Sequence, residues 1–213
     1  MQVHDDEQRS VTNRARREQI VQATMELIAE QGCRAATLQA VAKRAGIRST
    51  RTISYHFAGK DDLIAAVSAE IFRIIGAFVA GQATAPDDPR DALAAYIRSA
   101  VALNQTHRIP MRALTSIVLD HRPETEERPY DTKQENTAVT RVQDILERGQ
   151  QAGVFRPFDA WVMAVTVQRS LDGIGFLLEA RPDLDLTHYA DQLVDTFDRA
   201  TRAPRARRKG AKS

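Results

Sequence analysis

The stretch AGIRSTRTISYHF, Ala45 to Phe57, decides how the N-terminal part of this 213-residue chain folds. Gly46 predicts the end of a preceding helix, and Ser49 is a suitable N-cap for a short helix from Thr50 to Phe57. In that helix only Ile53 and Phe57, four residues apart, need to face a core. The other side chains are basic, hydroxylated or aromatic, so we expect the helix to present a polar face outward.

Two further helices are predicted before this stretch. The first runs over residues 14–31, ends at Gly32, and has an inward stripe made of Ile20, Thr24, Leu27, Ile28 and Gln31. The second follows the N-cap Thr37 and buries Leu38, Val41, Ala42 and Ala45. Two helices joined by a tight turn that contains glycine are typical of a helix-turn-helix.

Charge is distributed unevenly along the chain. Residues 31–60 contain six Lys or Arg and no acid, whereas residues 61–198 contain thirteen basic and twenty-two acidic residues. Duplex DNA is a dense line of negative charge, and its major groove admits one helix whose Arg, Ser and Thr side chains reach base edges or phosphates. The basic segment therefore indicates a DNA-binding surface, although charge alone also fits a solvated face.

The remainder of the chain is predicted to be helical, with breaks at Pro and Gly. All eight prolines lie beyond residue 85, and helices are expected at about 61–82, 89–106, 110–120, 130–152, 158–180 and 187–202. The expected fold class is all-α with about nine helices, in which a helix-turn-helix domain precedes a helical bundle. Apolar residues make up 43% of the chain, enough for a packed core, and no uncharged apolar run reaches membrane-spanning length. Together with the single cysteine, Cys33, this favours a cytoplasmic protein with no membrane partner.

Three segments resemble a known family. REQIVQATMELIAEQG, ATLQAVAKRAGI and ISYHFAGKDDLIAAV, within about residues 14–67, are similar to the N-terminal signature of tetracycline-repressor-type (TetR/AcrR) transcriptional regulators. The resemblance implies an all-helical homodimer that binds palindromic operator DNA through its first helices. It also implies that the remaining helices bind a small-molecule effector, whose identity the sequence does not specify, and form the dimer.

The resemblance assigns DNA-contact roles to individual positions. It implies phosphate contacts for Thr37, Tyr55, His56 and Lys60, and it places the leading turn of the recognition helix at Ser49 to Thr52. Between Gly46 and Tyr55 the chain is one residue longer than the usual family pattern. Arg48 is the apparent extra residue, and Arg51 replaces a common glycine. We predict Arg51 on a base edge and Arg48 on phosphate or nearby bases. The predicted DNA-binding residues are Thr37, Arg48, Ser49, Thr50, Arg51, Thr52, Ser54, Tyr55, His56 and Lys60.

The middle helices carry large or amphipathic side chains that line a ligand pocket or fill a core. These candidate ligand-binding residues are Phe72, Phe78, Tyr96, Met111, Trp161, Gln168 and Phe176. The last two helices are the expected dimer seam, because two glycines there allow close helix approach. The predicted interface residues are Leu171, Ile174, Gly175, Leu178, Leu193, Val194 and Phe197.

We therefore divide the chain into four regions. Residues 1–13 are expected to form a disordered arm, 14–60 the helix-turn-helix domain, 61–202 the ligand-binding and dimerisation domain, and 203–213 a basic disordered tail. No catalytic residues, cofactor or metal site are predicted, because neither clustered metal ligands nor a phosphate-binding loop is present in the sequence. The alternative functions are an all-helical small-molecule-binding protein or enzyme with a vestigial DNA-binding module, and a DNA binder without sequence preference.

Overall fold

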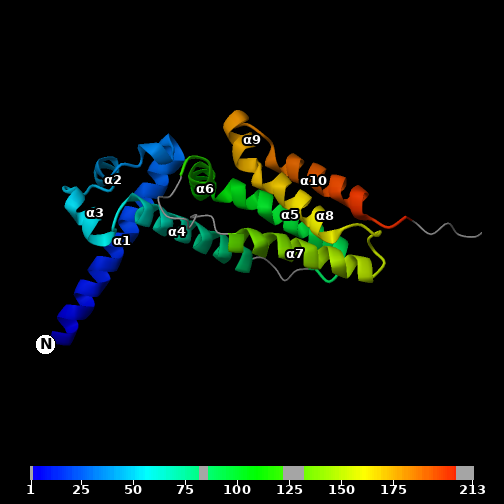
Figure 1. Cartoon of the computed structure of the whole chain (residues 1–213), viewed down its shortest axis with the longest axis horizontal. Helices are drawn as coiled ribbons and strands as arrows, with labels where there is room; N and C mark the ends of the chain where they lie inside the picture. Colours follow the sequence, from blue (N-terminus) through cyan, green and yellow to red (C-terminus); the bar gives the residue numbers. More distant parts are fainter. Residues whose placement is uncertain (1, 82–85, 122–131, 205–213) are drawn as a thin grey trace, which may run out of the picture. The chain divides into compact units, whose positions relative to one another are not determined.

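The computed structural model describes residues 2–81, 86–121 and 132–204, and the described backbone is almost entirely helical (Figure 1). The chain divides into two compact units, residues 1–81 with 106–131 and residues 82–105 with 132–213. The expectation of an all-α fold that begins with a helix-turn-helix is confirmed.

Unit 1 contains the N-terminal helices and one helix from the middle of the chain. Its elements are α1 (Gln2–Gln31), the 3-10 helix η1 (Cys33–Ala35), α2 (Leu38–Arg44), α3 (Thr50–His56), α4 (Lys60–Ala80) and α6 (Arg108–Asp120). The helix α1 packs against α2, α4 and α6. The shared core is formed by apolar side chains of all these helices, among them Ile20, Ile28, Val41, Ile53, Ile64 and Ile117.

This unit differs from the predictions in three ways. The helix α1 begins at Gln2, so it runs through the segment 1–13 that was expected to be a disordered arm. Gln31, predicted to face inward, is exposed. It is a polar residue and the last residue of α1. The compact unit also includes α4 and α6, whereas the predicted DNA-binding domain ends at Lys60.

Among the described residues, α4 has the length and apolar composition of a membrane span. The core helix of a soluble protein has the same properties, and α4 contributes to the core of unit 1. Its buried residues are Leu63, Ile64, Val67, Ser68 and Ile71.

Unit 2 contains α5 (Pro89–Thr106), α7 (Thr132–Gln151), α8 (Ala160–Asp172), α9 (Ile174–Ala180) and α10 (Leu186–Thr201). The prediction of one continuous helix over 158–180 is wrong, because the helix breaks at Gly173 into α8 and α9. Glycine has a low helix propensity, and here two glycines lie within three residues. The predicted tail beyond residue 204 lies outside the described residues.

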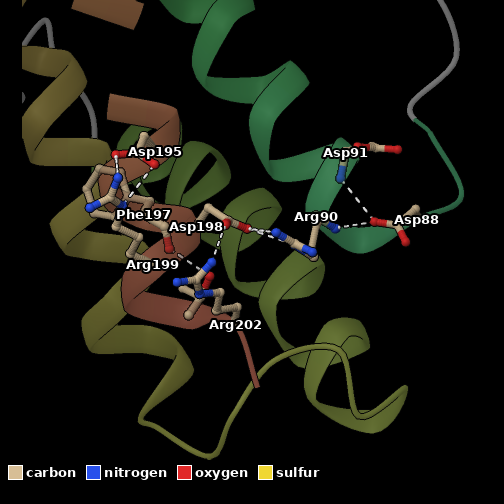
Figure 2. Close-up of polar contacts among 9 residues, drawn as sticks. Asp88, Arg90, Asp91, Asp195, Phe197, Asp198, Arg199 and Arg202 are labelled. Carbon is tan, nitrogen blue, oxygen red and sulfur yellow. Dashed lines mark hydrogen bonds and ion pairs between the residues drawn. The ribbon is translucent and has the colours of Figure 1, made fainter. Parts of the chain in front are cut away.

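Polar contacts tie α10 to the rest of unit 2 (Figure 2). Nε of Arg90, in the first turn of α5, donates to Oδ1 of Asp198 on α10 at 2.7 Å. The backbone after α10 pairs with the segment before α8, where the Arg156 N–H donates to the Thr201 carbonyl at 2.9 Å and the Ala203 N–H to the Val154 carbonyl at 3.0 Å. These hydrogen bonds join residues of unit 2 that are more than forty positions apart in the sequence.

A close contact within unit 2 predicts the effect of one substitution. A Cβ at Gly149 on α7 would lie 2.0 Å from the ring of Phe155, which is buried. We expect Gly149→Ala to lower the free energy of unfolding by about 1–3 kcal/mol, because the overpacking cost exceeds the gain in helix propensity. Chemical denaturation followed by circular dichroism measures the change.

Gly76→Ala on α4 is the matched control, because a Cβ there meets no atom within 4 Å. It should leave stability unchanged or raise it by up to about 1 kcal/mol. Equal effects of the two substitutions would contradict the assigned contact with Phe155.

Candidate nucleic-acid interface

The turn between α2 and α3 is fixed by backbone hydrogen bonds. The Gly46 N–H donates to the Lys43 carbonyl at 3.3 Å, and the Ile47 N–H donates to the Ala42 carbonyl at 2.8 Å. This pair of bonds is a Schellman motif, which requires a residue with positive φ after the helix. Gly46 supplies it with a φ of 66°, because glycine has no Cβ to clash in that conformation. The direction in which the chain enters α3 is therefore set by Gly46.

Both helices of the motif are capped as the sequence predicts. The Oγ1 of Thr37 accepts from the Ala40 N–H at 3.2 Å, and the Oγ of Ser49 accepts from the Arg51 N–H at 3.2 Å. Each cap satisfies a backbone donor that has no partner within its own helix.

The helix α3 has one buried side and one accessible side. Ile53 and Phe57 are 0% and 3% exposed, which confirms the prediction that they face the core. Arg51, Ser54 and Tyr55 are exposed, and Tyr55 reaches 73%. The helix ends at His56, and Phe57 is its C-cap, with extended backbone, so one anchor lies within α3 and the other directly after it.

The other predicted DNA-contact residues are also accessible to solvent. Arg48, in the turn, and Thr37, at the start of α2, are exposed, while Lys60, at the first position of α4, is half-buried. Thr50, Thr52 and His56 are half-buried, and Ser49 is exposed. The ten residues predicted from the sequence therefore all reach the surface of unit 1.

Ion pairs and a hydrogen bond from a glutamine side chain hold α1 against the helix-turn-helix. Arg44 on α2 bonds both carboxylate oxygens of Glu30 on α1, and its guanidinium holds the pKa of that carboxyl below the ordinary value. Nε2 of Gln19 on α1 donates to the Ala45 carbonyl at 2.7 Å. A cation–π contact adds to these, with the Arg17 guanidinium carbon 4.9 Å from the centre of the Phe57 ring. These contacts hold α1 against the end of α2 and against Phe57, the residue after α3.

An open groove of about 480 Å³ runs between α1 and α3. On the α3 side it is lined by Ser49, Arg51, Thr52, Tyr55 and His56, and on the α1 side by Thr12, Asn13 and Arg16. The three α1 residues were not among the predicted site residues, and two of them fall in the segment expected to be disordered. A signal for them was present, because residues 8–17 contain four Arg and no acid.

The candidate ligand-binding residues are distributed over both units. In unit 1, Phe72, Phe78 and Met111 are half-buried, and the Phe78 ring contacts the His107 ring edge-on at a centroid distance of 5.4 Å. In unit 2, the Tyr96 hydroxyl donates to Oε1 of Gln168 at 2.7 Å, and both side chains are half-buried.

Two ligand candidates lie on the surface of unit 2. Trp161 and Phe176 are 58% and 45% exposed. Their part in a ligand site stays a prediction.

Four of the predicted dimer-interface residues require correction, because they are not on the surface of the chain. Leu171, Ile174, Gly175 and Phe197 are buried within unit 2 of a single chain. They fill the core of that unit, which removes them from any surface that a partner contacts. Leu178, Leu193 and Val194 are half-buried, and their part in a dimer interface stays a prediction.

The short helix α3, with a buried apolar side and an acid-free outer side, defines unit 1 as a helix-turn-helix domain of the DNA-binding class. The family model described as "Bacterial regulatory proteins, tetR family" matches residues 20–67, which include α2, α3 and the start of α4. Over these residues the chain is similar to that family.

Two relatives match the N-terminal part of the chain. The HTH-type transcriptional regulator BetI of Stenotrophomonas maltophilia is 41% identical over 83 residues, 38% of this chain and 42% of the relative. BetI 1 of Chromohalobacter salexigens is 35% identical over 112 residues, 51% of this chain and 55% of the relative. The matched part of the chain thus spans about half the length of these curated relatives.

Solved structures extend the likeness of the fold over most of the chain. A transcriptional regulator of Saccharomonospora viridis in complex with choline has a TM-score of 0.74 at 21% identity, covering 88% of this chain and 98% of that one. The regulator AibR, in complex with isovaleryl coenzyme A and operator DNA, has a TM-score of 0.71 at 19% identity, covering 89% and 99%. At these identities the likeness shows a common fold.

Proposed function

We propose that this chain is a ligand-responsive, sequence-specific DNA-binding regulator that acts as a repressor at a palindromic operator. The observation that carries the proposal is the orientation of α3. Ile53 and Phe57 fix one side of the helix in the core, so that Arg51 and its polar neighbours project outward without any acid among them. No catalytic activity is proposed, and the cytoplasm, where bacterial DNA lies, is the proposed site of action.

The proposed division of roles follows the chemistry of each side chain. Arg51 donates to a base edge in the major groove, because its guanidinium matches the two acceptors of guanine. Thr37, Tyr55, His56 and Lys60 bind phosphates and set the position of α3 on the duplex. The hydroxyls of Ser49, Thr50, Thr52 and Ser54 add contacts to bases or phosphates.

We propose that α6 couples the DNA-binding helices to an effector. Within unit 1, Ser116 Oγ accepts from the Cys33 N–H at 2.8 Å, and His121 Nε2 lies 3.5 Å from Asp61 Oδ1 at the start of α4. Ile117 of α6 is buried in the same core as Ile53 of α3. A shift of α6 therefore displaces the helices that position α3.

Effector binding is proposed to change DNA affinity through this path. The chain continues from α5 of unit 2 through His107 directly into α6 of unit 1. The hydrogen-bonded pair of Tyr96 on α5 and Gln168 on α8 is a suitable polar contact for an effector in unit 2. The magnitude of the response is set by the difference in the effector's affinity for the two states.

The proposed dimer uses the exposed apolar side chains of α8 and α9. Trp161, Val162 and Phe176 are each at least 45% exposed, and large apolar groups on a surface are typical of interaction sites. A two-fold dimer would present two copies of α3 about one DNA turn apart, or a multiple of it, and would therefore bind a palindrome.

Substitution of Arg51 tests the base-contact assignment. We expect Arg51→Ala to weaken operator binding by about 1–3 kcal/mol and to relax sequence preference at one base pair of each half-site, because the guanidinium reads a base edge. Band-shift titrations against a set of single-base operator variants measure both effects. A loss of equal size on every variant would reject the assignment.

Lys60→Ala is the matched comparison, because it removes one positive charge from the same surface at a proposed phosphate contact. It should weaken all duplexes alike and reduce the dependence of log K on log salt by about one per subunit. A change of base preference would show that Lys60 is not a phosphate ligand.

A substitution that places a charge on the exposed face of α9 tests the proposed dimer interface. We expect Phe176→Asp to convert the dimer to monomers in sedimentation velocity, because a buried carboxylate in an apolar interface is strongly unfavourable. Val118→Asp on α6 is the control, since Val118 is 44% exposed in unit 1 and lies outside the proposed interface. An unchanged dimer in Phe176→Asp, or equal dissociation in both variants, would contradict the proposed interface.

A further inference from the structure

The groove between α1 and α3 points to a second DNA-contacting element beside the recognition helix. We propose that the exposed face of α1 at Asn13 and Arg16 binds the sugar–phosphate backbone of the strand that flanks α3. This inference rests on the proposed function and adds to it a contact on a helix outside the helix-turn-helix.

The position of these residues on α1 supports the inference. Thr12, Asn13 and Arg16 fall within five positions of a helix, with Thr12 and Arg16 at i and i+4, and all three line the groove. They are exposed, whereas four residues further along, Ile20 is fully buried. The helix thus changes at Ile20 from a polar face on the groove to an apolar face in the core.

The groove has the charge of an anion-binding surface. Its eight lining residues include Arg16, Arg51 and His56 and no acid. The opposite wall also carries donors suited to phosphate, the hydroxyls of Ser49, Thr52 and Tyr55. A backbone strand that lies along the groove while α3 occupies the major groove would therefore meet hydrogen-bond donors on both sides.

A hydrogen-bond chain holds Arg16 in place beside the motif. Its Nη1 donates to Oε1 of Gln19 at 2.7 Å, and Nε2 of Gln19 donates to the Ala45 carbonyl at the end of α2 at 2.7 Å. A guanidinium has five N–H donors, so this bond leaves most of them for a phosphate. Because Gln19 is neutral, the positive charge of Arg16 is not compensated by its partner.

Arg16→Ala tests the inference in the full-length chain. We expect about tenfold weaker binding to the operator duplex at low salt, a similar factor on a random-sequence duplex, and a salt dependence reduced by about one per subunit. Arg16→Lys should retain most of the salt dependence, because it keeps the charge. Hydroxyl-radical footprinting should lose protection at the flank of each half-site in Arg16→Ala while the central protection remains.

Arg73→Ala is the control for loss of one positive charge in the same unit. Arg73 is exposed on α4, pairs with Glu70 at 2.6 Å and does not line the groove. The proposed backbone contact is overturned if Arg16→Ala binds the operator duplex as tightly as Arg73→Ala does. It is also overturned if the loss of affinity in Arg16→Ala depends on the base at a single position. If the unsubstituted chain binds no duplex, the proposed function fails as well, so the two failures are distinguishable.

Discussion

The burial of Ile53 and Phe57 is the interaction on which the DNA-binding surface depends. These two side chains anchor a seven-residue helix that is too short to be stable alone. Ile53 within α3 and Phe57 at its C-cap fix the rotation of α3 about its axis, and that rotation decides which side chains point outward. If either anchor were lost, Arg51 and Tyr55 would remain in the sequence but would no longer share a fixed face.

The rest of unit 1 supports those two anchors from several directions. Gly46 sets the path into α3, the Glu30–Arg44 pair and the Gln19 amide hold α2 against α1, and the Phe57 ring lies under Arg17. The surface ion pair is a modest contribution, because exposed salt bridges stabilise weakly. The core shared by α1, α4 and α6 is the larger contribution, and it links the position of α3 to that of α6.

Local signals in the sequence were sufficient for the helix-turn-helix. The caps at Thr37 and Ser49, the stop at Gly46 and the inward spacing of Ile53 and Phe57 depend on neighbouring residues only. The first turns of α1 were missed because residues 2–13 are mostly polar and lack apolar periodicity. The ligand and dimer residues were harder, since large apolar groups such as Trp161 and Ile174 look alike in sequence, and only the packing of distant helices exposes one and buries the other. Contacts such as Arg90 with Asp198 join positions too far apart for any local pattern.

Selection of DNA by the purified chain from a library of random duplexes tests the central claim most directly. If the outward face of α3 reads sequence in two copies, the recovered duplexes should share an inverted repeat whose half-site centres lie about one helical turn, or a multiple of it, apart. Recovered duplexes whose sequences do not differ from the starting library would contradict it.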